Sequence, residues 1–207
     1  IQGRVALAMG YPKNTSPLKL IEAFAERMAK PIPPVRVDKA PFEENVDVGD
    51  SINLLKFPSP WIHGMDGGRY FGTWDICITK DPETEWVNWG VYRTMVHDKK
   101  TLGILLHPAG QHAGHMFFNR YEPMDKPMPI AVVVGADPLS LLAATTSLPQ
   151  GESEAGLAGG LRGEPLPVVK CKTIDLEVPA TAEIVVEGLV LPRTRRAEGP
   201  FGEYTGY

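Results

Sequence analysis

The chain has 207 residues, 43% hydrophobic and 22% charged, which is typical of a globular protein with one large domain, or one domain and part of another. Its formal net charge of -4 leaves no basic excess to neutralise phosphates, which argues against nucleic acid as the main partner. The sequence has no apolar run near the roughly 20 residues of a membrane span and no signal-type opening, so we expect a cytoplasmic protein with no membrane partner.

The first fifty residues predict a helix followed by a linker. Residues 18–30 place apolar side chains at helical spacing, directly after a Ser16-Pro17 pair that suits a helix N-terminus. Prolines and acidic residues then follow between residues 31 and 47, as they do in linkers. We therefore expect a domain boundary near residue 50, with residues 1–50 ending one domain and residues 51–207 forming another.

From residue 70 onwards the pattern changes to short strands rich in β-branched and aromatic residues. The expected strands are residues 70–79, 85–96, 101–106, 130–134, 168–176 and 182–190, and the expected helices are residues 111–121, 138–145 and 153–161. Locally paired strands with helices inserted between them predict an α+β domain around an antiparallel barrel or curved sheet. Cys77 and Cys171 lie in strand-like segments, which indicates buried free thiols rather than a disulfide or metal ligands.

The last ten residues hold two glutamates in apolar surroundings. Glu198 and Glu203 flank a Gly-Pro turn and a glycine, and Phe201 and two tyrosines are their neighbours. Apolar neighbours raise carboxyl pKa values towards neutrality, where a glutamate can give and take protons. The segment predicts a pair of acid–base groups or, equally well on local composition, a tight turn with both glutamates in water.

Arg93 is the candidate partner of these acids. It ends an apolar, strand-like segment that begins at Asn88, where an unpaired guanidinium would be prohibitive. The alternative is an arginine that pairs with any acid at the end of a barrel. Asn88 and Arg93 would face opposite sides of a regular strand, unless a bulge or twist at Gly90 re-aims one of them.

Asn88, His112 and Glu154 together offer an amide oxygen, an imidazole and a carboxylate. This mixture suits Mn²⁺ or Mg²⁺ bridging a phosphate better than it suits a metal that prefers thiolates. Each residue also has an ordinary structural alternative. A lone histidine is more often structural than a ligand, and Glu154 follows Ser153, a good N-cap, where an acid stabilises the helix dipole.

Several separate motifs, in the right order, resemble the UbiD family of prenylated-FMN-dependent decarboxylases from about residue 52 to the end. They are Asp66-Gly-Gly-Arg-Tyr70, Ile78-Thr-Lys-Asp-Pro82, Asn88-Trp-Gly-Val-Tyr-Arg93, Gln111-His112, Ser153-Glu154, Val169-Lys-Cys171 with Asp175-Leu-Glu-Val-Pro-Ala180, and Glu198-Gly-Pro-Phe-Gly-Glu203. The resemblance implies a flavin reductase-like, FMN-binding split β-barrel over residues 51–207, preceded by part of an α/β domain over residues 1–50. The family's C-terminal oligomerisation domain would be absent, so the chain would be either a fragment of a longer protein or a form that lacks this domain.

The resemblance also implies roles for site residues. Arg93, Glu198 and Glu203 match the family's Arg-Glu-Glu catalytic set, in which the arginine orients the departing carboxylate and Glu203 stands in the proton-donor position. The positions that match the metal ligands, for Mn²⁺ (or Mg²⁺) with a K⁺ nearby, are Asn88, His112 and Glu154. The residues expected to line the cofactor are Asn88, Trp89, Gly90, Val91, Arg93, Gln111, His112, Thr145, Thr146, Ser147, Leu148 and Glu154.

The function implied by the resemblance is a reversible, nonoxidative decarboxylation of an aromatic, heteroaromatic or α,β-unsaturated carboxylic acid. A flavin prenyltransferase would supply the prenylated FMN, and the full-length protein would form a homodimer or homohexamer. Two alternatives stay open. A split-barrel flavin reductase with plain FMN would consume NAD(P)H without releasing CO₂, and a noncatalytic or truncated cofactor-binding subunit would bind flavin and metal without turnover.

Overall fold

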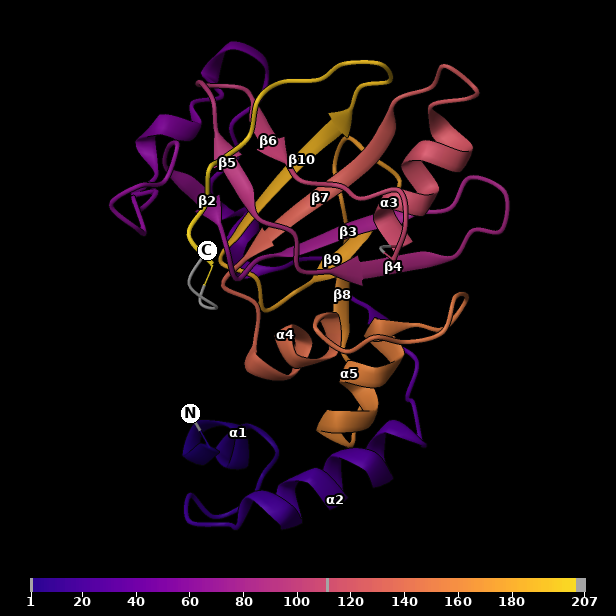
Figure 1. Ribbon diagram of the computed structural model, residues 1–207. Coiled ribbons are helices and arrows are strands. Elements are labelled where there is room, and N and C mark those ends of the chain that lie inside the picture. Colours follow the sequence, from indigo (N-terminus) through magenta and orange to yellow (C-terminus); the bar gives the residue numbers. More distant parts are fainter. Residues whose placement is uncertain (1, 111, 204–207) are drawn as a thin grey trace.

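The strands lie in one half of the molecule, and helices α1, α2, α4 and α5 lie below them (Figure 1). The computed structural model describes residues 2–110 and 112–203. Its helices are α1 (Gln2–Ala8), α2 (Pro17–Met28), α3 (His112–Met116), α4 (Pro138–Ala144) and α5 (Glu154–Arg162), with a π-helical turn, η4 (Phe117–Tyr121), after α3. Its strands are β1 (Val35–Arg36), β2 (Tyr70–Gly72), β3 (Ile76–Lys80), β4 (Val87–Gly90), β5 (Thr94–Val96), β6 (Leu102–Ile104), β7 (Met128–Val134), β8 (Pro167–Lys170), β9 (Glu177–Pro179) and β10 (Ile184–Val190).

The strands form three small, open sheets. One has the order β10-β7-β3-β4 and another the order β2-β5-β6, and both are antiparallel throughout. The third, β1-β8-β9, joins a parallel pair, β1 and β8, to the antiparallel β9. The mixture of helices and mainly antiparallel sheets confirms the predicted α+β class.

A hydrophobic core joins the four-stranded sheet to the helices beneath it. Ile76, Ile78 and Val133 on β3 and β7 belong to the same buried cluster as Ala143 on α4 and Leu157 on α5. Burying a side chain of the size of isoleucine or leucine contributes about 1.5–3 kcal/mol. This packing holds α4 and α5 against the sheet, and both helices contact β4.

The helix starts follow from their capping residues, as the sequence predicts. The Ser16 hydroxyl accepts a hydrogen bond from the amide of Lys19, and Pro17 opens α2. Ser153 accepts from the amide of Gly156 at 3.1 Å, so Glu154 is the first residue of α5. The serine cap therefore decides where Glu154 stands in the fold.

The predicted strand over residues 85–96 is wrong, because this stretch forms two strands in different sheets. β4 pairs with β3, whereas β5 pairs with β2 and β6. Gly90 sits in regular register opposite Cys77, so no bulge re-aims Arg93. The chain leaves one ladder after Gly90 and enters the other at Thr94, and this change of sheet places Arg93 at the junction.

Two other predicted strands are also divided. Residues 70–79 form β2 and β3, separated by a turn, and residues 168–176 form β8 followed by a loop that ends before β9. In that loop the amide of Cys171 donates to the carbonyl of Leu176 and closes a tight connection. Apolar content alone did not reveal these breaks, because buried loops and strands share it.

Residues before position 50 contribute to the main core. β1 adds a strand beside β8, α2 contacts α5, and Ala6 and Leu20 belong to the cluster around β3 and β7. The domain boundary near residue 50 stays a prediction. Across residues 2–110 and 112–203, no helix combines the length and apolarity needed to cross a membrane. Cys77 and Cys171 are buried free thiols, as expected.

Candidate active site

Arg93 binds both glutamates of the C-terminal segment, residues 191–203 after β10. Its Nε and Nη2 donate to the two carboxylate oxygens of Glu198 at 2.9 and 2.8 Å, and its Nη1 donates to Glu203 Oε1 at 3.0 Å. A bidentate pair of this kind fixes both position and orientation. The Glu198 side chain is 8% exposed and that of Glu203 41% exposed, so the acids do not both face water. The hydrogen bond to Glu198 raises the pKa of Arg93, although burial opposes it.

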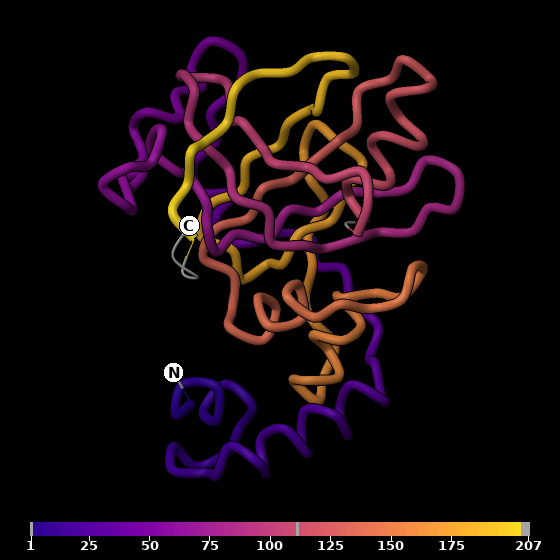
Figure 2. The backbone as a smooth tube through the Cα atoms, viewed as in Figure 1, coloured from indigo at the N-terminus to yellow at the C-terminus, as the bar shows by residue number. Residues whose placement is uncertain are grey.

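After β10 the chain passes β6 and β5 (Figure 1), and the tube view shows the same path (Figure 2). After β10, Arg196 donates to Asp98 at 3.2 Å and the amide of Gly199 approaches the Met95 sulfur at 3.4 Å. Gly199 has a φ of 88°, a conformation that favours glycine. These contacts bring Glu198 and Glu203 back to a residue more than one hundred positions earlier.

Aromatic side chains enclose the ion pair. The Phe201 ring lies 4.6 Å from that of Tyr70 and 5.3 Å from that of His63, centroid to centroid, and the Arg93 guanidinium stands 5.0 Å from the Phe201 centroid. The buried Tyr70 hydroxyl donates to Glu198 Oε1 at 2.8 Å. Sequence reasoning did not single out Tyr70 as a site residue, although it ends the Asp66–Tyr70 motif.

A second polar group is built around β4, with one contact from α3 and one from α5. Asn88 Oδ1 lies 3.2 Å from His112 Nδ1, and Glu154 Oε2 accepts from the amide of Trp89 at 3.0 Å. Asn88 and Glu154 are each 2% exposed. Burial raises the pKa of Glu154 to about 7 and lowers that of His112, so the imidazole favours its neutral form.

The donors of this second group fit a divalent cation. Glu154 has no ion pair to any residue that the structure describes, and the buried amide nitrogen of Asn88 makes no hydrogen bond there. Within the same residues no three His, Cys, Asp or Glu side chains are grouped to hold a metal. A metal here would therefore use the Asn88 amide oxygen beside one imidazole and one carboxylate, a set that suits Mn²⁺ or Mg²⁺.

The residues predicted to line the cofactor surround β4. Trp89 and Gly90 lie on this strand and are buried, and Val91 follows it half-buried. The positions of Thr145, Thr146, Ser147 and Leu148 follow α4, which contacts β4. Gln111 lies outside the described residues. His115 shares α3 with His112 but faces Asn119, 2.8 Å away, and joins neither polar group.

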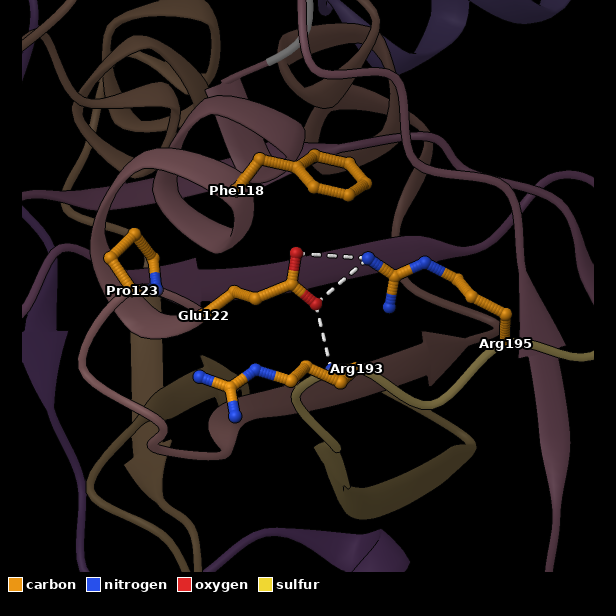
Figure 3. Close-up of a pocket in the computed structure, with 5 residues that line it drawn as sticks. All are labelled: Phe118, Glu122, Pro123, Arg193 and Arg195. Atoms are coloured by element: carbon orange, nitrogen blue, oxygen red, sulfur yellow. Dashed lines mark hydrogen bonds and ion pairs between the residues drawn. The ribbon is translucent and has the colours of Figure 1, made fainter.

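A surface pocket of about 440 Å³ lies apart from both groups, lined by Phe118, Glu122, Pro123, Arg193 and Arg195 (Figure 3). Arg195 Nη2 donates to both oxygens of Glu122 at 2.8 and 2.9 Å, and the amide of Arg193 donates to the same carboxylate. The Arg193 guanidinium pairs with Asp125. Both guanidinium groups are therefore already neutralised, and the pocket is a structural junction between η4 and the C-terminal segment.

A family model described as "UbiD: 3-octaprenyl-4-hydroxybenzoate carboxy-lyase Rift-related domain" matches residues 34–207. The chain belongs to the UbiD family. It is 42% identical over 205 residues to a pyrrole-2-carboxylic acid decarboxylase of Pseudomonas aeruginosa, and 36% identical over 211 residues to ferulic acid decarboxylase 1 of Saccharomyces cerevisiae. Each match covers 99% of this chain but 41% of the relative, so the chain spans about two fifths of their length.

Solved structures of the family share the fold. The UbiD-class enzyme HmfF from Pelotomaculum thermopropionicum, in complex with FMN, matches all of this chain with a TM-score of 0.90 and 38% identity. An evolved dimeric form of HmfF, in complex with prFMN, matches with a TM-score of 0.91 and 37% identity. This chain covers 45% and 47% of those two chains. The likeness to these FMN-binding enzymes, together with the open sheets, confirms the predicted split-barrel class.

Proposed function

We propose that the protein containing this chain is a prenylated-FMN-dependent decarboxylase. Its substrate would be an aromatic, heteroaromatic or α,β-unsaturated carboxylic acid, and the reaction would be nonoxidative and reversible. The observation that carries the proposal is the Arg93 guanidinium bound to both Glu198 and Glu203, within a chain of the UbiD family. The relatives named for pyrrole-2-carboxylic, ferulic and phenolic acids support this substrate class.

Arg93 would bind and orient the substrate carboxylate. Its Nε and Nη2 are occupied by Glu198, whereas Nη1 faces the more exposed Glu203. A substrate carboxylate can therefore approach the Nη1 side without displacing the bidentate pair. Glu198 keeps the guanidinium in place and balances its charge. The direction of the Nη1 hydrogen bonds, rather than a net positive charge, would then orient the substrate carboxylate.

Glu203 would supply the proton. When bound, prenylated FMN would act as an electron sink for the electrons left by the departing carboxylate. Glu203 Oε1 is held by Arg93 at 3.0 Å, and its half-exposed side chain leaves the carboxyl group accessible to a substrate. In this role the acid transfers its proton to the carbon that lost CO₂ and is then reprotonated from solvent.

Asn88, His112 and Glu154 would hold a divalent cation, Mn²⁺ or Mg²⁺, that joins the cofactor phosphate to β4. The uncompensated, buried carboxylate of Glu154 supports this assignment, because a cation would provide the missing countercharge. The residues that would line the flavin are Trp89, Gly90, Val91, Gln111 and Thr145 to Leu148. A nearby K⁺, a flavin prenyltransferase as cofactor supplier and a homodimeric or homohexameric assembly are further parts of this proposal.

The deciding experiment identifies the cofactor. The full-length protein is produced together with a flavin prenyltransferase, and the released flavin is analysed by mass and absorbance while bound metal is measured by elemental analysis. We expect prenylated FMN with one divalent cation, and release of CO₂ from an unsaturated or aromatic acid. Plain FMN with consumption of NAD(P)H would indicate a flavin reductase instead. Bound prenylated flavin without turnover would indicate a noncatalytic subunit.

A further inference from the structure

Tyr70 holds the carboxylate of Glu198 together with Arg93. Its hydroxyl donates to Glu198 Oε1 at 2.8 Å, and its fully buried ring packs against Phe201 in the same C-terminal segment. Glu198 Oε1 thus accepts two hydrogen bonds, from a guanidinium and from a phenol. Rotation of this carboxylate would break at least one of them, so its orientation is fixed.

Asp66 holds the backbone immediately before Glu203. Its fully buried carboxylate accepts from the amide of Gly202 at 2.8 Å and from the amide of His63 at 2.8 Å, one through each oxygen. Burial raises the pKa of Asp66, but the hydrogen bonds from Gly202 and His63 outweigh it and hold the pKa below its usual range. An ionised aspartate therefore bridges two distant backbone segments.

Gly67 brings the two backbones into direct contact. Its amide donates to the carbonyl of Pro200 at 2.7 Å, and a Cβ on Gly67 would lie 2.0 Å from the carbonyl oxygen of Gly199. Backbone atoms cannot give way as the end of a flexible side chain can. Gly64, three residues earlier, has no atom within 4 Å of its Cβ position, so a methyl group fits at Gly64 but not at Gly67.

We propose that Asp66, Gly67 and Tyr70, within residues 63–70, form the positioning element for the two glutamates: Tyr70 orients Glu198, while Asp66 and Gly67 fix the turn that carries Glu203. The inference rests on the proposed function, because it assigns roles relative to Arg93, Glu198 and Glu203. None of the residues of this element needs to touch the substrate. They act through the geometry of the acids, and a misplacement of about 1 Å at a reacting group is enough to lower turnover about a hundredfold.

The first test replaces Tyr70 by phenylalanine in the full-length protein loaded with cofactor. The Y70F variant should lower kcat about tenfold with little change in KM, because the hydrogen bond to a charged partner is lost while substrate binding groups remain. The matched control is Tyr121→Phe, since the Tyr121 hydroxyl donates to the carbonyl of Lys80, away from the site. Bound flavin absorbance and thermal unfolding are measured for both variants.

The split between kcat and KM distinguishes positioning from a merely structural role. Without the phenol, the Glu198 carboxylate loses one of its three hydrogen-bond donors, while both bonds from Arg93 remain. A positioning role therefore predicts a lower kcat with unchanged KM, bound flavin and thermal unfolding. An unchanged kcat in Y70F, or equal losses in Y70F and Y121F, would overturn the inference.

The second test compares Gly67→Ala with Gly64→Ala. The G67A variant should lose about a hundredfold in kcat and retain bound flavin, whereas G64A should behave as the unsubstituted protein. If G67A does not fold, Asp66→Asn against Asp81→Asn examines the same contact, because Asp81 also accepts two backbone amides but outside the site. Normal turnover in G67A, or in D66N if G67A does not fold, would contradict the positioning role.

Failure of this inference and failure of the proposed function give different results. If Glu203→Gln retains turnover, the proposed catalytic set is wrong whatever the variants at residues 63–70 do. If Glu203→Gln abolishes turnover while Y70F and G67A retain it, the catalytic set stands and only the positioning element is rejected.

Discussion

Two buried carboxylates, Glu198 and Glu154, differ in what balances their charge. Glu198 accepts two hydrogen bonds from Arg93 and one from Tyr70. Glu154 is more deeply buried, at 2% exposed, yet accepts from the backbone amide of Trp89 and pairs with no cation among the described residues. Glu198 is therefore paired with a cationic side chain, whereas Glu154 is paired with none in the described part of the chain.

The groups around Arg93 and around Glu154 therefore obtain their geometry in different ways. The carboxylate of Glu198 is compensated by Arg93, so this ion pair forms within the polypeptide and can stand ready before a substrate arrives. The Glu154 carboxylate has no ion-pair partner among the described residues, which costs free energy that the proposed cation would offset. We therefore expect substitutions in the two regions to have opposite effects on the stability of the metal-free protein.

The largest effect on turnover should come from Glu203→Gln, which tests whether the group around Arg93 is catalytic. The amide keeps the shape of the side chain and can still accept from Arg93, but it has no acidic proton to transfer. Turnover should fall about 10³-fold, while bound flavin and thermal stability remain unchanged. Steady-state decarboxylation and flavin absorbance measure both outcomes, and near-normal turnover would remove Glu203 from the proton-donor position.

Glu154→Gln tests whether the group of Asn88, His112 and Glu154 binds a divalent cation. The affinity for Mn²⁺ should fall about a hundredfold, because the site loses its negatively charged donor. The metal-free protein should instead gain about 1–3 kcal/mol in unfolding free energy, since an unpaired buried charge is removed. Calorimetric titration with Mn²⁺ and denaturant unfolding without metal provide the measurements.

The matched control for Glu154→Gln is Glu187→Gln. Glu187 also accepts hydrogen bonds from backbone amides, those of Lys172 and Thr173, but it stands away from Asn88 and His112. This variant should bind Mn²⁺ normally. A loss of metal-free stability in the Glu154 variant would contradict the comparison, because it would mean that the carboxylate is compensated after all.

Asp75 offers a second uncompensated carboxylate outside the proposed metal ligands. It accepts from Thr94 Oγ1 at 3.1 Å, its other oxygen makes no hydrogen bond within the described residues, and burial raises its pKa to about 6. The folded state therefore binds the proton more tightly than the unfolded state does. The resulting free-energy penalty is small below pH 4, grows as pH rises towards 6, and is constant above that.

Asp75→Asn should consequently stabilise the protein by about 2–3 kcal/mol above pH 7 and by progressively less towards pH 4. Urea unfolding of both proteins across this pH range measures the difference. A gain that does not change with pH would show that packing, rather than the missing countercharge, is responsible.

Glu198→Gln should have the smallest effect on stability, and it should destabilise the protein, whereas Glu154→Gln and Asp75→Asn should stabilise it. Replacing the charged partner of Arg93 weakens a pair whose members are 20% and 8% exposed, and the unfolding free energy should fall by about 1–2 kcal/mol. The same urea experiments report it. If Glu198→Gln and Glu154→Gln shift stability in the same direction, the proposed difference between the two regions is wrong.

Local signals were sufficient where one residue acts on its immediate neighbours. Ser16 and Ser153 predicted the starts of α2 and α5, because a serine cap needs only the amides of the following turn. The predicted strands at residues 130–134 and 182–190 correspond to β7 and β10, each of which contains three consecutive β-branched residues. The predicted strand at residues 85–96 failed, because nothing local marks the point where a chain leaves one sheet for another.

Sequence alone determined the chemistry available to this protein: an arginine, two glutamates in an apolar turn, and an amide, an imidazole and a carboxylate suited to a hard cation. Only the tertiary structure decided how these groups are used. It placed Arg93 within 3 Å of glutamates 105 and 110 residues away, and buried Glu154 with no cationic side chain paired to it among residues 2–110 and 112–203. The physical reason is that charge compensation depends on distance and burial, which packing of remote segments creates and local sequence does not encode.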